Sequence, residues 1–347
     1  MKNNPFTITF GIEPSAPIKR IVEAEKIIDD FSSDPIGNHV YIITGPRGCG
    51  KTVLLSCVAN MLSKDKDWIV VDPGPKDNIL ENIASEIYET TKAKKLFLNG
   101  EFSFSFQGLT FSLKGKEPVT TAISLIKKMV GYLNKRGKRI LITIDEADNS
   151  EQMKLFIQAY QSLIRQNYQI MLLMTGLYEN ISKLQDDKSL TFLYRAPKIY
   201  LGPLDIASIS KSYETNLGIS SDMALRCAKF TNGYAYAYQV LGHLLYEKET
   251  KSLSEEVISD FDQYLFEYVY EKVYSELSDN EQKLVHAFKT DSEIKIEDLR
   301  SQSGFDSKTM SVYRDRLLKK GIVLCPKYGY LRFTFPRFNE FLRIKDF

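Results

Sequence analysis

The fold is decided by the stretch Ile42-Ile43-Thr44-Gly45-Pro46-Arg47-Gly48-Cys49-Gly50-Lys51-Thr52. A β-branched run leads into a glycine-rich loop that ends in Lys-Thr, and an apolar helical segment follows. Gly45, four further residues and then Gly50-Lys51-Thr52 have the spacing of a phosphate-cradling loop. Its glycines let successive backbone N–H groups point into one concavity beside the positive end of a helix dipole. A plain glycine-rich turn is the alternative, but the spacing and the flanking elements favour a nucleoside-triphosphate site.

The loop residues have separate expected roles. The Lys51 ammonium would reach the β- and γ-phosphates, and the Thr52 hydroxyl would hold Mg²⁺. ATP or ADP together with Mg²⁺ is therefore the expected ligand. The residues expected to contact it from this motif are Gly45, Pro46, Arg47, Gly48, Cys49, Gly50, Lys51, Thr52 and Val53.

A second motif supplies two carboxylates. The apolar run at 139–144 predicts a strand, and Asp145 and Glu146 follow it directly. Ligands bind at the C-terminal ends of strands in open parallel sheets, so we expect this pair to meet the phosphate loop. Asp145 would orient Mg²⁺ through its water shell, and Glu146 would polarise the attacking water. An acidic pair alone also occurs in solvated turns, but about 95 residues after a phosphate loop it favours hydrolysis.

Strands alternate with helices through residues 1–204. This order predicts an α/β fold, a P-loop NTPase core with a parallel sheet and right-handed crossovers. Residues 96–114 interrupt the order with alternating Phe and Leu around Gly108, which predicts an inserted β-hairpin. Its apolar face would pack on its own domain or on a protein partner. Thr175 ends a later strand, where it is either a plain strand-terminal residue or a polar group beside the γ-phosphate.

From residue 205 onward the apolar residues recur at helical spacing. Residues 205–276 predict a helical lid over the nucleotide. Residues 277–347 predict three helices and a hairpin, which is the pattern of a winged helix-turn-helix. From residue 300 to the end there are 11 basic and four acidic residues, a net charge of +7, which favours double-stranded DNA as a partner. The expected DNA contacts are Lys308, Ser311 and Arg314 on one helix and Lys327 and Arg332 on the wing.

The composition is that of a globular protein with two or three domains. Of 347 residues, 43% are hydrophobic and 26% are charged, and the net charge of +2 gives no global attraction to acidic partners. No apolar run approaches the roughly 20 residues that cross a bilayer, and the N-terminus lacks a signal-peptide pattern. The four cysteines lack metal-ligand spacing and are expected to be reduced thiols. We therefore expect a cytoplasmic protein with no membrane partner.

Together these motifs resemble AAA+-related and STAND-type P-loop ATPases, above all the origin-recognition-like ATPases of bacteria and archaea that end in a winged helix. The resemblance covers almost the whole chain. Its first two blocks are specific, and the others depend on their order along the chain. The blocks are GPRGCGKT at 45–52, ILITIDEAD at 140–148, IMLLMTGL at 170–177, YRAP at 194–197, TNGYAYAYQVLG at 231–242 and SKTMSVYRDRLLKKGIV at 307–323.

The resemblance implies an AAA+-like three-layer sheet and further site residues. Thr175 takes the first sensor position. Arg195 is similar to the arginine finger, which in such ATPases acts on the γ-phosphate of a neighbouring subunit and so implies a homo-oligomer. Gly233 and Tyr234 lie where related lids contact the nucleotide.

The lid departs from the family pattern at two positions. The family's proline is replaced by Ala235, and Tyr236 stands where other AAA+ lids carry a second sensor arginine. This departure fits slow, switch-like ATP turnover better than a processive motor.

Two functions follow as hypotheses. The first is an ATP-binding and ATP-hydrolysing switch whose nucleotide state controls DNA binding by the winged helix. The alternative is a signalling or defence ATPase whose winged helix and aromatic hairpin bind protein partners. A metabolic kinase is disfavoured, because the Asp145-Glu146 pair suits activation of water rather than of a substrate hydroxyl.

Overall fold

The computed structural model describes residues 4–9, 14, 17–18, 20–74, 77–90, 92–95 and 121–345. The chain divides into two compact units. The first, the sheet unit, comprises Arg20–Thr44 and Thr52–Tyr200, and the second, the helical unit, comprises Met1–Lys19, Gly45–Lys51 and Leu201–Phe347. The β-hairpin predicted at 96–114 lies outside the described residues.

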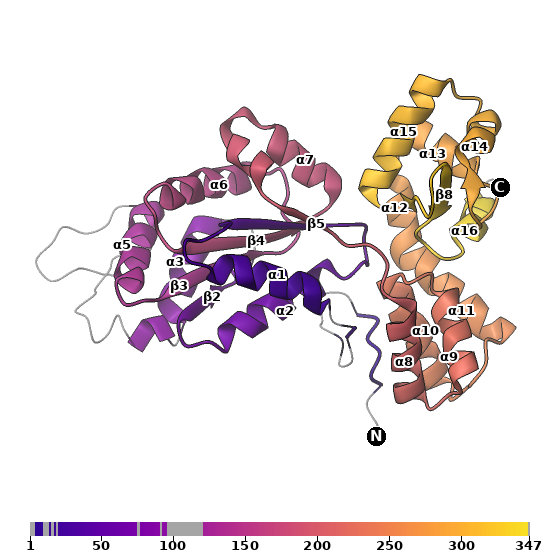
Figure 1. Cartoon of the computed structure of the whole chain (residues 1–347), viewed down its shortest axis with the longest axis horizontal. Coiled ribbons are helices and arrows are strands. Elements are labelled where there is room, and N and C mark those ends of the chain that lie inside the picture. The colour runs from indigo at the N-terminus through magenta and orange to yellow at the C-terminus, as the bar shows by residue number, and fades with distance from the viewer. Residues whose placement is uncertain are drawn as a thin grey trace, which may run out of the picture. The chain divides into compact units, whose positions relative to one another are not determined.

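The sheet unit is built on parallel strands. They are β1 (Val40–Thr44), β2 (Trp68–Val71), β3 (Arg139–Ile144), β4 (Ile170–Gly176) and β5 (Lys198–Tyr200). Their order in this five-stranded sheet is β2-β3-β4-β1-β5 (Figure 1). Every residue of β1 and β4 is buried, as expected for strands covered on both faces. Thr44 pairs with Gly176 of β4 and Ile144 with Met174, so β1, β3 and β4 end at the same edge.

Helices connect the strands of the sheet unit. They are α1 (Ile21–Ser32), α2 (Lys51–Ser63), α3 (Ile79–Glu89), α5 (Ala122–Asn134), α6 (Glu151–Ile164), α7 (Tyr178–Asp186) and the 3-10 helix η1 (Lys188–Arg195). Figure 1 shows α1 and α2 along one side of the sheet and α5 and α6 along the other. Alternate strand residues such as Ile42 and Leu172 share one core with α3, α5 and α6, whereas Tyr41 packs edge-on against Phe31 of α1. The predicted α/β fold with a parallel sheet between helical layers is confirmed.

The helical unit continues the chain after β5. Its first helices are α8 (Ile206–Leu217), α9 (Ser221–Phe230), α10 (Ala235–Glu247) and α11 (Glu255–Leu265). Apolar periodicity predicts a helix over 254–276, and the structure is helical over nearly all of this range. A π-helical turn, η2 (Phe266–Tyr270), separates α11 from α12 (Glu271–Ser275), and within it the adjacent Val269 and Tyr270 are both buried. Apolar periodicity alone does not distinguish such a turn from a regular helix.

The last part of the helical unit combines short helices with a small sheet. The helices are α13 (Asp279–His286), α14 (Ile296–Ser303), α15 (Ser307–Lys320) and α16 (Phe338–Lys345). The strands β6 (Ile294–Lys295), β7 (Val323–Leu324) and β8 (Tyr330–Phe333) form an antiparallel sheet in the order β6-β8-β7. The sequence predicted only the two wing strands, because a strand as short as β6 shows no periodicity. The identification of this part as a winged helix stays a prediction.

One hydrophobic core runs through the helical unit. Tyr270 is fully buried, packs against Phe335 and Phe338, and donates its hydroxyl to the Pro336 carbonyl at 2.6 Å. Phe6, near the N-terminus, belongs to the same core and contacts Tyr238 of α10 edge-on. The predicted domain boundaries at 204/205 and 276/277 stay predictions. None of the described helices combines the length and the apolar character that crossing a lipid bilayer requires.

Candidate nucleotide site

Asp145 joins two strand ends and a helix of the sheet unit. Its Oδ2 accepts a hydrogen bond from Thr52 Oγ1 at 2.9 Å, and its Oδ1 accepts one from Thr175 Oγ1 at 2.5 Å. Thr175 is fully buried, so its hydroxyl needs a partner inside the protein. Thr52 lies at the start of α2, Asp145 follows β3 and Thr175 lies on β4. The predicted metal-binding pair and the predicted sensor threonine are thus brought together.

Glu146 lies on a turn with a left-handed backbone. Its φ is 54°, a region that non-glycine residues rarely adopt. Two acceptors lie within hydrogen-bonding distance of its backbone N–H: Thr175 Oγ1 at 2.9 Å and Asp145 Oδ1 at 3.1 Å. Its side chain is exposed. A strained φ/ψ conformation that neighbouring hydrogen bonds hold in place is typical of functional positions, because it fixes the direction of one side chain.

The Thr52 and Asp145 side chains fit a hard cation. A hydroxyl and a carboxylate oxygen 2.9 Å apart are the ligand type that Mg²⁺ prefers. Mg²⁺ keeps several waters and shares substrate phosphates, so it does not need a protein cage. Accordingly, the described part of the chain contains no cluster of three or more His, Cys, Asp or Glu side chains suited to a metal.

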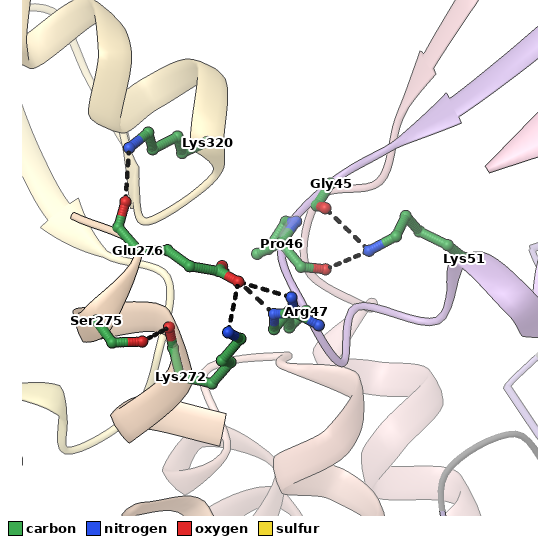
Figure 2. A network of polar contacts seen from close by, with 8 residues as sticks. All are labelled: Gly45, Pro46, Arg47, Lys51, Lys272, Ser275, Glu276 and Lys320. Atoms are coloured by element: carbon green, nitrogen blue, oxygen red, sulfur yellow. Dashed lines mark hydrogen bonds and ion pairs between the residues drawn. The ribbon is translucent and has the colours of Figure 1, made fainter. Parts of the chain in front are cut away.

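The phosphate-loop motif is curled, as its glycines allow. Gly45, Gly48 and Gly50 have φ values of 152°, 69° and 93°, which favour glycine. Lys51 Nζ donates to the carbonyl of Gly45 at 3.0 Å and to that of Pro46 at 2.8 Å (Figure 2). The Lys51 side chain therefore bonds the end of the loop to its first two residues.

Residues at the start of α10, in the predicted lid, contact the same loop. Tyr234 donates its hydroxyl to the Arg47 carbonyl at 2.7 Å, and the Tyr236 backbone N–H donates to the Gly48 carbonyl at 3.0 Å. A Cβ atom at Gly48 would lie 2.3 Å from the Tyr234 hydroxyl oxygen, so this approach requires glycine. Burial raises the pKa of Tyr234 well above its ordinary value, which keeps the hydroxyl protonated as a donor.

The Arg47 side chain forms an ion pair with Glu276. Its Nη2 lies 2.7 Å from Glu276 Oε1, and both side chains are about one-third exposed. Figure 2 shows Lys272 approaching the same carboxylate at 3.6 Å and Lys320 Nζ donating to the Glu276 carbonyl at 3.4 Å. Lys320 also pairs with the buried Glu281 at 2.9 Å. Since Glu276 and Lys320 flank α13 through α15, the network connects the loop to the C-terminal helices.

Two residues implied by the family resemblance have distinct environments. Arg195 ends η1 and is exposed, as a residue that reaches another molecule must be. Gly233 has a φ of 75°, and its carbonyl accepts a hydrogen bond from Leu204 N at 2.7 Å. A Cβ there would lie 2.5 Å from the Leu204 carbonyl oxygen, so glycine is required by the turn that precedes Tyr234.

The predicted DNA contacts are placed unevenly. Lys308 and Ser311 are exposed on α15, but Arg314 is half-buried and its Nε is enclosed without a partner among the described residues. Arg314 follows Lys308 by six residues, and at 100° per residue the two side chains point about 120° apart around the helix axis. They therefore do not share one face of α15.

The two residues predicted to lie on a wing contact other residues of the chain itself. Lys327 pairs with Glu293 at 2.8 Å and lies 4.1 Å above the Tyr330 ring centre. Arg332 is half-buried, and its Nε has no partner within the described residues. Neither residue therefore presents a fully solvated positive charge.

Sequence reasoning missed the residues that contact the loop from outside. The sequence gives no role to Glu276, and it predicts only the start of the first wing strand at Gly321, where a Cβ would lie 2.5 Å from Pro46 Cδ. Tyr234 was expected to contact the nucleotide, whereas its hydroxyl is bonded to a loop carbonyl. No local pattern could have revealed these contacts, because more than 180 residues separate the partners.

Two family models match parts of the chain. Residues 31–192 match the family model of an ATPase domain found predominantly in Archaea, and residues 267–342 match a domain of unknown function. No curated protein matches the sequence.

Solved structures are similar over nearly the whole chain. A Walker-type ATPase of Pyrococcus abyssi is 14% identical over 97% of this chain and 99% of its own, with a TM-score of 0.66. The ORC2 protein of Aeropyrum pernix with ADPNP and ADP is 15% identical over 97% and 96%, with a TM-score of 0.59. The chain thus has the fold of an origin-recognition-like P-loop ATPase.

Proposed function

We propose that this protein is a molecular switch that binds ATP with Mg²⁺ and hydrolyses it slowly. The observation that carries the proposal is the pair of hydrogen bonds on Asp145, one from Thr52 and one from Thr175. Thr52 directly follows the loop lysine, and Glu146 directly follows Asp145. A second carboxylate at this edge of the sheet is suited to accept a proton from the attacking water, a role that anion binding alone does not call for.

Each residue has a role in this proposal. Thr52 and Asp145 would hold Mg²⁺, which neutralises phosphate charge when it is bound. Glu146 would accept the proton of the attacking water, and its fixed backbone would keep the carboxylate oriented. Thr175 would hold Asp145 and Glu146 in place besides any contact with the γ-phosphate. Arg195, exposed at the end of η1, would serve a neighbouring subunit.

Phosphate release in the presence of excess ATP tests the proposed activity. We expect slow release at a constant rate that stops when EDTA removes Mg²⁺, because Thr52 and Asp145 are suited to that ion. ATP binding by the same preparation is followed by calorimetry. Binding without any phosphate release would contradict the hydrolytic role of Glu146, and release that persists in EDTA would contradict the metal role.

We also propose that the C-terminal elements form a winged helix that binds double-stranded DNA. The exposed side of α15 carries Lys308, Ser311, Arg316 and Lys319, although Lys319 pairs with Asp315 at 2.7 Å. The local net charge of +7 supports the same partner. An exposed helix face with this charge is suited to lie along phosphates or in a major groove.

Replacing Lys308 with alanine should weaken duplex binding about equally for all sequences. If Lys308 contacts a phosphate, the slope of log affinity against log salt concentration should decrease by about one, because one counterion fewer is released. Fluorescence anisotropy at several salt concentrations measures both effects. Lys229→Ala on α9, another exposed lysine, is the matched control and should change neither.

A protein partner is the second candidate for the C-terminal elements. Tyr328 is fully exposed at the turn before β8, and Val312 is 43% exposed on α15. Apolar groups of this kind suit a protein surface better than a phosphate backbone. If no duplex binds to the wild-type protein even at low salt, this candidate replaces the DNA proposal.

A further inference from the structure

The carbonyl oxygens of four successive loop residues all accept hydrogen bonds from the protein. Lys51 bonds the Gly45 and Pro46 carbonyls, Tyr234 bonds the Arg47 carbonyl and Tyr236 bonds the Gly48 carbonyl. In a trans peptide the C=O of one residue and the N–H of the next point in opposite directions. The two bonds from the lid therefore direct the N–H groups of Gly48 and Cys49 away from the lid.

We propose that Tyr234 is a positioning residue that prepares the loop for the phosphates of ATP by fixing the Arg47 peptide. It acts through this carbonyl and need not contact the nucleotide. The inference rests on the proposed function. It goes beyond that function by naming Tyr234 as a residue that sets the affinity of the loop for phosphate. The residues at the start of α10 are then a structural element of the phosphate site itself.

The chemistry of Tyr234 suits this role. The side chain is 1% exposed and packs edge-on against Phe335 at 5.1 Å between ring centres, so the ring has little freedom to move. Its hydroxyl remains a donor, because deprotonation would place a charge in the core. With the hydroxyl removed, the Arg47 carbonyl would lose a buried partner and the peptide could rotate.

Further contacts act on the same side of the loop. Glu276 binds the Arg47 guanidinium, and Gly321 approaches Pro46 so closely that a Cβ would lie 2.5 Å from its Cδ. The outer side of residues 46–48 is thus contacted by the lid, by the end of α12 and by the end of α15. This leaves the inner side, where the Gly48 and Cys49 N–H groups point, for an anion.

The test compares Tyr234→Phe with Tyr238→Phe. Tyr238 is equally buried at 1% exposure and shares a hydrogen bond with Ser212 Oγ at 2.6 Å, so the control also removes one buried hydroxyl contact in the same helical unit. For Tyr234→Phe we expect the Kd for Mg-ATP to rise about 2- to 12-fold, since a typical buried hydrogen bond is lost. The KM should rise in parallel with kcat nearly unchanged, because the loop acts on binding. Tyr238→Phe should leave both at wild-type values.

Amide hydrogen exchange of nucleotide-free protein gives a second readout. In Tyr234→Phe the peptide covering 45–52 should exchange faster than in the wild type and in Tyr238→Phe. Unchanged exchange there, or equal changes of Kd in both variants, would overturn the positioning role. If the wild type itself bound no Mg-ATP, the proposed function would fail instead, and the exchange result would still decide whether Tyr234 fixes the loop.

Discussion

Lys51→Ala abolishes ATP binding in the concentration range over which the wild-type protein binds. The ammonium is the charge that the loop would place on the β- and γ-phosphates, and charged hydrogen bonds contribute about 1.5–3 kcal/mol each. Loss of two such bonds corresponds to roughly 10²- to 10⁴-fold in affinity. Lys51 also bonds the Gly45 and Pro46 carbonyls, so its removal loosens the loop as well. Calorimetry with Mg-ATP measures the loss.

The control for this variant is Lys64→Ala. Lys64 is exposed just after the end of α2 and carries the same charge, so any effect of net charge alone appears there too. Both variants should unfold at temperatures close to that of the wild type. Affinity of Lys51→Ala within a few-fold of the wild type would refute the assignment of the loop as the phosphate site.

Glu146→Gln keeps ATP binding and loses hydrolysis by roughly 10²-fold or more. Glutamine has nearly the same size as glutamate but cannot accept a proton from water. The backbone at 146 is held at a φ of 54° by contacts of its N–H, which the substitution does not remove. The variant should therefore retain the local structure. Phosphate release under single-turnover conditions measures the rate, and calorimetry measures binding.

Glu151→Gln is the matched control for the acidic position. Glu151 begins α6, and its 82%-exposed side chain pairs with Lys154, so it has no contact with Asp145 or Thr175 in this structure. Its hydrolysis rate should equal that of the wild type. If Glu146→Gln hydrolysed ATP at the wild-type rate, another group would have to activate the water.

The fold was predictable where the physical cause is local. Strands as apolar as 140–144, where Thr143 is the one polar residue, are expected to be covered on both faces, and their alternation with helices favours a parallel sheet. The loop at 45–52 was predictable because its glycines and its Lys-Thr ending each meet a separate requirement of a phosphate. The meeting of Asp145 with Thr52 followed from the rule that parallel strands end at one edge.

The surroundings of the site were not predictable in the same way. Glu276 lies 229 positions from Arg47, and one acidic residue in a charged helix carries no sign of a distant partner. The family resemblance implies a nucleotide contact for Tyr234 but does not show which atom its hydroxyl reaches, and in the structure that atom is the Arg47 carbonyl oxygen. Lys308, Ser311 and Arg314 were predicted to share one helical face from two spacings of three, yet a spacing of four follows the exposed side of α15 more closely.

The contact between Gly321 and Pro46 has a consequence for how variants of this protein behave. Position 321 combines a φ of 73° with a neighbour that leaves no room for a methyl group. A larger side chain at position 321 would displace Pro46 and the loop at 45–52, although the substitution lies in the last tenth of the chain. If the proposed function holds, a substitution at position 321 would alter nucleotide binding while every residue of the matched range 31–192 is intact.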